Sequence, residues 1–115
     1  MQIEVKDKKL RAALDDEALC KRRYGADMTK KLTMRIGALE AAQSLATFWP
    51  PFSGPERVHQ LKGDLKGTFS VDLKQPYRLL VRPLGEGTTE AATDEQERWK
   101  SITAIEVIGI EDTHG

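Results

Sequence analysis

Residues 57–83, with the sequence RVHQLKGDLKGTFSVDLKQPYRLLVRP, decide the fold. Apolar and polar side chains alternate along residues 68–73, and they alternate again along residues 77–82 with one exception. This period of two predicts two half-buried β-strands. The connection between them, Lys74-Gln75-Pro76, is short, so we expect the two strands to form a hairpin.

Further strands are predicted on both sides of this hairpin. Residues 58–61 fit a short strand, which a turn bracketed by glycines separates from the hairpin, and residues 2–5 fit another. Residues 102–110 are apolar at both parities, which is typical of a central strand. The sequence therefore predicts a mainly antiparallel sheet of four to five strands.

The predicted helices lie between the first strand and the hairpin. Residues 8–14 fit one or two helical turns, and residues 17–24 fit a short helix with an acidic first turn. The longest helix is expected over residues 28–47, with Asp27 as its cap. Its apolar stripe consists of Met28, Leu32, Ile36 and Leu39. We therefore expect an α+β fold in which the N-terminal strand and helices pack on the sheet.

Composition sets limits on the class of protein. The chain has 115 residues, of which 39% are hydrophobic and 31% charged, and these values fit a single domain spanning residues 1–115. Its one cysteine, Cys20, excludes an internal disulfide and fits a reducing compartment. The N-terminal MQIEVKDKKL is too charged for a signal peptide, and no apolar run approaches the roughly 20 residues of a membrane span. We expect a cytoplasmic protein that does not bind membranes.

Charge is unevenly distributed, although the formal net charge is zero. Residues 1–53 and 54–83 each carry a net charge of +3, whereas residues 84–115 carry −6. A polyanion would therefore prefer the first two segments and avoid the third. Residues 84–100, LGEGTTEAATDEQERWK, are predicted to be an acidic insertion between the last two strands, with some helix near its end.

The stretch quoted first resembles the second half of RelE/ParE-superfamily toxins, most closely the HigB-like (proteic killer) branch. The shared elements are Arg57, His59, Leu61-Lys62-Gly63, Gly67, Phe69-Ser70-Val71, Tyr77-Arg78-Leu79 and Asp112-Thr113-His114. The N-terminal strand, the KDKKL segment and the helix ending in GALEAAQSL also follow the pattern. The resemblance covers nearly the whole chain apart from residues 84–100, and it implies a RelE/ParE-like fold.

The resemblance also implies a function. Such proteins are small cytoplasmic toxins of type II toxin-antitoxin systems, and each is silenced in a hetero-oligomer with its antitoxin, here expected to be a small helix-turn-helix protein. HigB-like members are endoribonucleases, and many cut mRNA in the ribosomal A site. ParE-like members share the fold but poison DNA gyrase and lack the nuclease residues. The resemblance thus favours an mRNA endoribonuclease that works on the ribosome.

RNA cleavage without a metal needs a base for the 2′-OH, a cation for the phosphate and an acid for the leaving 5′-oxygen. The predicted catalytic residues are Arg78 and Lys62, which would stabilise the phosphate, and His114, which would be the acid or base. His59 could serve as acid or base too. The predicted RNA-binding residues are Arg57, His59, Lys66 and Arg82. Because Arg78 and Arg82 are four apart on one strand, we expect both on a basic sheet face opposite the helices.

Two departures from the family pattern keep an alternative open. Thr113 stands where the family usually has an aromatic residue before the terminal histidine, and the chain is neutral where the family is usually basic. They favour a non-catalytic binding protein of the same fold, either gyrase-directed or a toxin that has lost catalysis. A small accessory domain without toxic role is a further alternative. Two histidines and one cysteine form no recognisable metal-binding pattern, so we expect neither metal nor cofactor.

Overall fold

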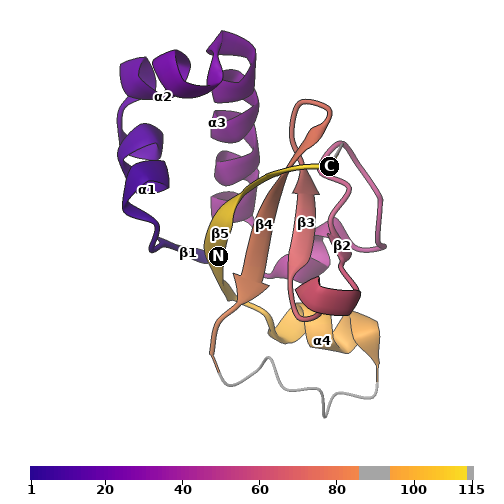
Figure 1. Ribbon diagram of the computed structural model, residues 1–115. Coiled ribbons are helices and arrows are strands. Elements are labelled where there is room, and N and C mark those ends of the chain that lie inside the picture. The colour runs from indigo at the N-terminus through magenta and orange to yellow at the C-terminus, as the bar shows by residue number, and fades with distance from the viewer. Residues whose placement is uncertain (86–93, 114–115) are drawn as a thin grey trace.

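The structure is a computed structural model, and it describes residues 1–85 and 94–113. Figure 1 shows the order and arrangement of the elements. In chain order they are β1 (Gln2–Val5), α1 (Lys8–Asp15), α2 (Glu17–Tyr24), α3 (Ala26–Ala41), the 3-10 helix η1 (Leu45–Phe48), β2 (His59–Gln60), the 3-10 helix η2 (Gly63–Leu65), β3 (Phe69–Asp72), β4 (Tyr77–Pro83), α4 (Glu95–Ser101) and β5 (Ala104–Asp112). None of the helices in this part of the chain has the length and apolar character needed to cross a membrane.

The strands form one five-stranded sheet in the order β1-β5-β4-β3-β2. β5 pairs in parallel with β1 and antiparallel with β4, so it is a central strand, as its composition predicts. β3 pairs antiparallel with both β4 and β2, and β3 and β4 form the expected hairpin. The predicted α+β fold with a mainly antiparallel sheet is confirmed.

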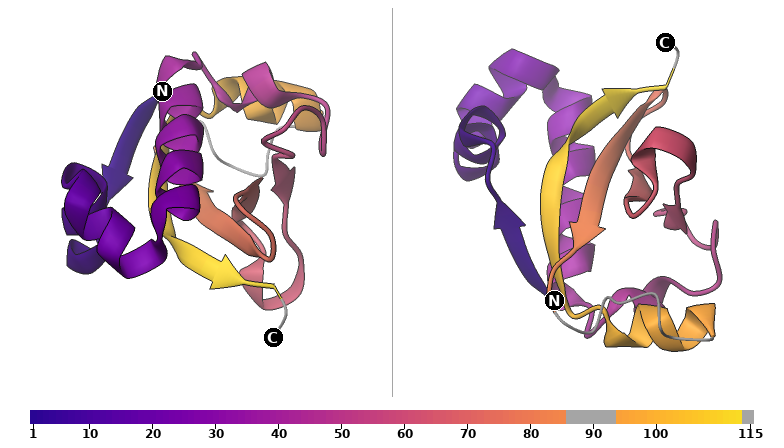
Figure 2. Two further views of the ribbon diagram at one scale, coloured as in Figure 1. Left: turned by 90° about the horizontal axis from the view of Figure 1, so that it is seen from above. Right: turned by 60° about the horizontal axis from the view of Figure 1, so that its bottom comes forward.

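The hydrophobic core lies between α3 and one face of the sheet. Figure 2 shows α3 crossing that face, with α1 and α2 beyond β1. Leu32 and Leu39 of α3 are 1% and 0% exposed, and Leu79 and Val81 of β4 are both fully buried. Because Tyr77 alternates in step with Leu79 and Val81, the sequence predicts that it shares this core, but it is 38% exposed. That prediction was wrong because Tyr77 is the first residue of β4, at the hairpin end of the sheet.

Helix caps explain where the N-terminal helices begin. Asp7 caps α1 and Asp16 caps α2, each accepting a hydrogen bond from a backbone N–H in the first turn. Gly25, with φ of 88°, separates α2 from α3, and side-chain-bearing residues rarely adopt this conformation. Asp27, predicted as the cap of the long helix, instead lies in its first turn.

Helix α3 ends at Ala41, so the predicted end at residue 47 was wrong. Ser44 caps the separate 3-10 helix η1, which takes up the remainder of the predicted segment. The N-terminal ammonium group of Met1 donates to the backbone oxygen of Glu40 at 2.9 Å, at the C-terminal end of α3. This contact joins residues far apart in the sequence, so helical periodicity could not predict it.

The C-terminal part of the acidic insertion belongs to the core. Trp99 of α4 is fully buried, and its ring makes edge-on contacts with Trp49 and Phe69 at centroid distances of 5.0 and 5.4 Å. The helix expected near the end of the insertion is therefore present as α4. Residues 86–93 of the insertion lie outside the described part of the chain.

Candidate nucleic-acid interface

Arg78, predicted to bind phosphate, is paired with a carboxylate. It lies opposite Glu111 in the register of β4 and β5, and its Nε and Nη2 donate to Glu111 Oε1 at 3.1 and 2.5 Å. Asp72 of β3 is its cross-strand neighbour on the other side. Only 21% of the Arg78 side chain is exposed. Its positive charge is thus half-buried between two acidic residues.

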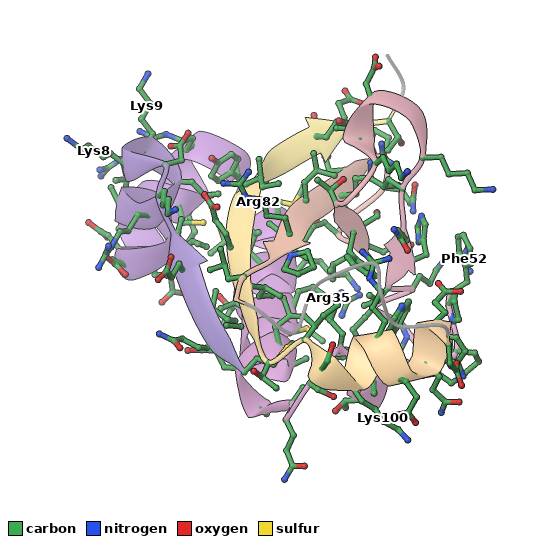
Figure 3. The ribbon with its side chains drawn as sticks, turned by 90° about the horizontal axis from the view of Figure 1, so that it is seen from below. Lys8, Lys9, Arg35, Phe52, Arg82 and Lys100 are labelled. Carbon is green, nitrogen blue, oxygen red and sulfur yellow. The ribbon has the colours of Figure 1, made fainter. Side chains whose placement is uncertain are left out.

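Arg82 follows the same pattern on the same sheet face. Its Nε and Nη2 lie 2.8 and 2.6 Å from Glu106 Oε1. The Glu106 side chain is buried and also lies 3.8 Å from Lys6 Nζ. Figure 3 shows Arg82 beside the paired strands, away from the helical side of the molecule that carries Lys8 and Lys9. The Arg82 charge is therefore compensated within the fold.

Arg57 also has an acidic partner, because its Nε lies 3.3 Å from Asp72 Oδ2. Each of the predicted arginines is thus next to a carboxylate, and the sheet face is mixed in charge rather than basic. The expectation of a basic face failed because Glu106 and Glu111 come into register with the arginines only once β5 has paired with β4. The roles of these arginines in RNA binding stay predictions.

His59, Lys62 and Lys66 come together in a pocket of about 460 Å³ beside β2 and η2. The other residues that line it are Pro51, Phe52, Gln60, Leu61, Gly63 and Glu95. Lys62 is exposed and, within the part of the chain that the structure describes, pairs with no carboxylate. A larger hollow of about 700 Å³ lies between β1, α1 and α3, but none of the predicted site residues lines it. The predicted residues therefore single out the pocket at β2.

The His59 ring is oriented by two contacts. Its Nδ1 lies 2.7 Å from the backbone oxygen of Arg57, and because a carbonyl only accepts, Nδ1 must carry the proton. In the neutral ring Nε2 is then left to accept a proton. The ring also stacks on Phe52, with centroids 3.9 Å apart and planes inclined by 17°. His59 is thus held with one nitrogen available for proton transfer.

Phe52 is the pocket residue that the sequence analysis missed. It is 50% exposed, and the guanidinium carbon of Arg57 lies 5.2 Å from its ring centroid. Its backbone has φ of 66°, and its N–H donates to the backbone oxygen of Val58 at 3.1 Å. The available signal was its position between Pro50-Pro51 and Gly54-Pro55, since such residues form turns that expose the side chain between them.

The loop that carries Phe52 is tied to the core by side chains. Ser53 Oγ donates to the backbone oxygen of Phe48 at 3.0 Å. Arg35 of α3, only 4% exposed, donates from Nη2 to the backbone oxygen of Pro55 at 3.1 Å and from Nε to that of Asp72 at 2.7 Å. A buried guanidinium group therefore links this loop to both α3 and β3.

The C-terminal tail reaches the hairpin turn next to Arg78. The backbone N–H and the hydroxyl of Thr113 both donate to the backbone oxygen of Pro76, at 2.9 and 2.6 Å. Thr113, which stands where the toxins that the sequence resembles have an aromatic ring, therefore has a structural contact. His114, predicted as the acid or base, lies outside the described residues, and its role stays a prediction.

The pocket offers chemical groups that suit RNA. An oriented imidazole can take up or release a proton, a lysine ammonium attracts phosphate, and an exposed aromatic ring can stack on a base. In residues 1–85 and 94–113, no group of three or more His, Cys, Asp or Glu side chains is arranged to hold a metal ion.

The fold that carries this pocket is similar to that of solved toxin structures. No protein-family profile and no curated protein matches the sequence, but solved structures match the fold. A YoeB/ParE toxin from Agrobacterium tumefaciens is 20% identical, with a TM-score of 0.57, over 97% of this chain and 98% of that one. A chain of a YoeB-YefM complex from Staphylococcus aureus is 14% identical, with a TM-score of 0.52, over 96% of this chain and 94% of that one. These likenesses confirm the predicted fold, whereas the HigB-like branch stays a prediction.

Proposed function

We propose that this protein is the toxin of a type II toxin-antitoxin system. The support is the match to a YoeB/ParE toxin along nearly the full length of both chains. The second similar structure is a YoeB-YefM complex, which supports a protein partner for this chain as well. We infer that the partner is a cognate antitoxin, expected to be a small helix-turn-helix protein, and that the pair resides in the cytoplasm.

We further propose that the toxin is a metal-independent endoribonuclease of the HigB-like branch that cleaves mRNA on the ribosome. The observation that carries this proposal is the convergence of His59, Lys62 and Lys66 in one pocket. The three residues come from the Lys-Gly stretch that resembles the HigB-like toxins. An imidazole beside lysine ammonium groups is a combination that RNA cleavage needs.

The proposed reaction is attack of a ribose 2′-oxygen on the adjacent phosphorus. His59 Nε2 would take the 2′-OH proton, because its Nδ1 proton is held by the Arg57 carbonyl. Lys62 would stabilise the negative charge that develops on the phosphate oxygens. The bond from phosphorus to the 5′-oxygen would then break, and His114 would protonate the leaving oxygen. The products would be a 2′,3′-cyclic phosphate and a new 5′-hydroxyl end.

The test is induced expression of the chain without its antitoxin, with growth and the 5′ ends of cellular mRNA recorded together. We expect growth arrest and new mRNA ends inside translated codons. His59→Asn and Lys62→Ala should remove both effects, whereas Arg22→Ala, on the exposed surface of α2, should remove neither. New ends that persist in His59→Asn would contradict the assignment of the base.

The second candidate function is a toxin that binds its target without cutting RNA, gyrase being the expected target. The observation that favours it is the pairing of Arg57, Arg78 and Arg82 with carboxylates, which leaves these cations less available to phosphate. Arrest with unchanged mRNA ends would support this candidate. Supercoiling of a plasmid by gyrase in the presence of the purified chain would then identify or exclude that target.

A further inference from the structure

We propose that Phe52 is a stacking surface for a nucleobase, so that the pocket at β2 binds one base of single-stranded RNA with a neighbouring phosphate at Lys62. This inference rests on the proposed RNA-directed function and deepens it. It names a contact that recognises the base itself, whereas lysines recognise only the backbone. It also gives the pocket a contact that distinguishes a base from the bare backbone.

The first argument is that Phe52 is exposed although its backbone is strained. Its φ of 66° lies in the left-handed region that residues other than glycine rarely adopt. Arg57, at the other end of the same loop, has φ of 45°. An aromatic ring on a strained backbone normally gains free energy by burial, yet half of Phe52 is exposed. Strained residues that persist in a tied loop gather at binding sites, which is the role proposed here.

The second argument is the set of groups around the ring. His59 covers one face of the ring, with centroids 3.9 Å apart, so a base can stack only on the opposite face. The Arg57 guanidinium carbon lies 5.2 Å from the ring centroid. Single-stranded RNA is bound by such combinations, in which bases stack on aromatic or guanidinium planes while cations hold the phosphates. Lys62 supplies an exposed cation in the same pocket. The pocket volume of about 460 Å³ lies within the range of small-ligand sites.

The third argument is a comparison with other exposed apolar side chains. Met34 is also 50% exposed, and Ile108 is 37% exposed, but among the described residues the aromatic and cation–π contacts include neither of them. Exposed apolar residues scattered singly are ordinary on protein surfaces. Met34 also lines a hollow, of about 430 Å³, together with Lys30, Lys31 and Lys74. Phe52 differs because its pocket holds the imidazole of His59 as well as two lysines. Met34 therefore serves as a matched control.

The test is binding of a non-cleavable tetranucleotide to the purified chain. The probe is a four-nucleotide RNA whose 2′-hydroxyls are methylated, and its control is the same backbone without bases. We expect the wild type to bind the base-containing probe about tenfold more tightly, because stacking on one aromatic ring has roughly that effect. Phe52→Gly should abolish the difference, and glycine accepts the φ of 66° without strain. Phe52→Trp and Met34→Ala should preserve it.

The Phe52→Leu variant is a control for the possibility that Phe52→Gly acts through collapse of the loop. It keeps apolar bulk beside His59 but lacks a π face, so it should lose the preference for bases as Phe52→Gly does. A preference that survives in both variants would refute the inference, and so would a wild type that binds both probes equally. Base-dependent binding that needs Phe52, in a protein that leaves mRNA intact in cells, would support the stacking surface and contradict the nuclease. Cleavage of mRNA in cells, together with probe binding that does not depend on Phe52, would support the nuclease and contradict the stacking surface.

Discussion

Arg35→Met is expected to destabilise the fold strongly, although the arginine pairs with no carboxylate among the described residues. The Arg35 guanidinium donates to the backbone oxygens of Pro55 and Asp72, at 3.1 and 2.7 Å, and is only 4% exposed. Methionine can replace the apolar stem of the arginine but has no group that donates a hydrogen bond. The substitution therefore leaves the backbone oxygens of Pro55 and Asp72 without these donors.

The magnitude follows from these two hydrogen bonds. A hydrogen bond with a charged partner contributes about 1.5–3 kcal/mol. The loss of the two bonds is partly offset, because a methionine at this position does not have the desolvation cost of a buried guanidinium group. We expect a net loss of about 2–4 kcal/mol in the free energy of unfolding. For a domain of this size that corresponds to a fall in Tm of roughly 8–16 °C.

Urea denaturation and thermal melting of the purified chain measure the loss. The control is Arg22→Met on the exposed surface of α2, which should change the free energy of unfolding by less than about 0.5 kcal/mol. Arg35→Lys keeps the positive charge but has a single donor group, so its loss in the free energy of unfolding should lie between those of Arg22→Met and Arg35→Met. A loss below about 1 kcal/mol in Arg35→Met would refute the reasoning that this guanidinium ties the Phe52 loop to the core.

Three further outcomes are expected. Trp99→Ala should cost about 3–5 kcal/mol of stability in urea, whereas Trp99→Phe should cost less, because the buried indole N–H has no hydrogen-bond partner in the described residues. Glu111→Gln should raise affinity for the tetranucleotide a few-fold by releasing the charge of Arg78; unchanged affinity would show that Arg78 does not bind phosphate. Glu95→Gln should likewise strengthen binding, since Glu95 lines the pocket, and weaker binding would place the phosphate elsewhere.

Local patterns made much of the fold predictable. The alternation along residues 68–73 and 77–82 identified β3 and β4, because the apolar positions of one parity, Phe69, Val71, Leu79 and Val81, are fully buried in the core. The part of the site whose residues are close together in the sequence was equally predictable. His59, Lys62 and Lys66 lie within eight residues of one another, so one turn at η2 brings them to the same pocket. Phe52 was missed because its stacking on His59 depends on a loop conformation without periodicity.

The ion pairs across β4 and β5 show why the charge of the sheet face could not be predicted. Arg78 and Arg82 are four residues apart and face the same side, but their partners Glu111 and Glu106 are five apart. In a regular strand an odd spacing would turn one of these carboxylates into the core. The register shift between Leu80 and Val81 resolves this, because Leu80 pairs with Gly109 and Val81 with Val107.

Ile108 is therefore an extra residue in β5, in the manner of a β-bulge. Along β5 every second residue faces the core, and the extra residue shifts this alternation by one position. Val107 and Ile110 therefore both pack against the core although they are three residues apart. The last strand is apolar at both parities partly for this reason, and not only because it is central. One inserted residue thus brings both glutamates to the arginine face, and it sets how much of that face remains available to a polyanion.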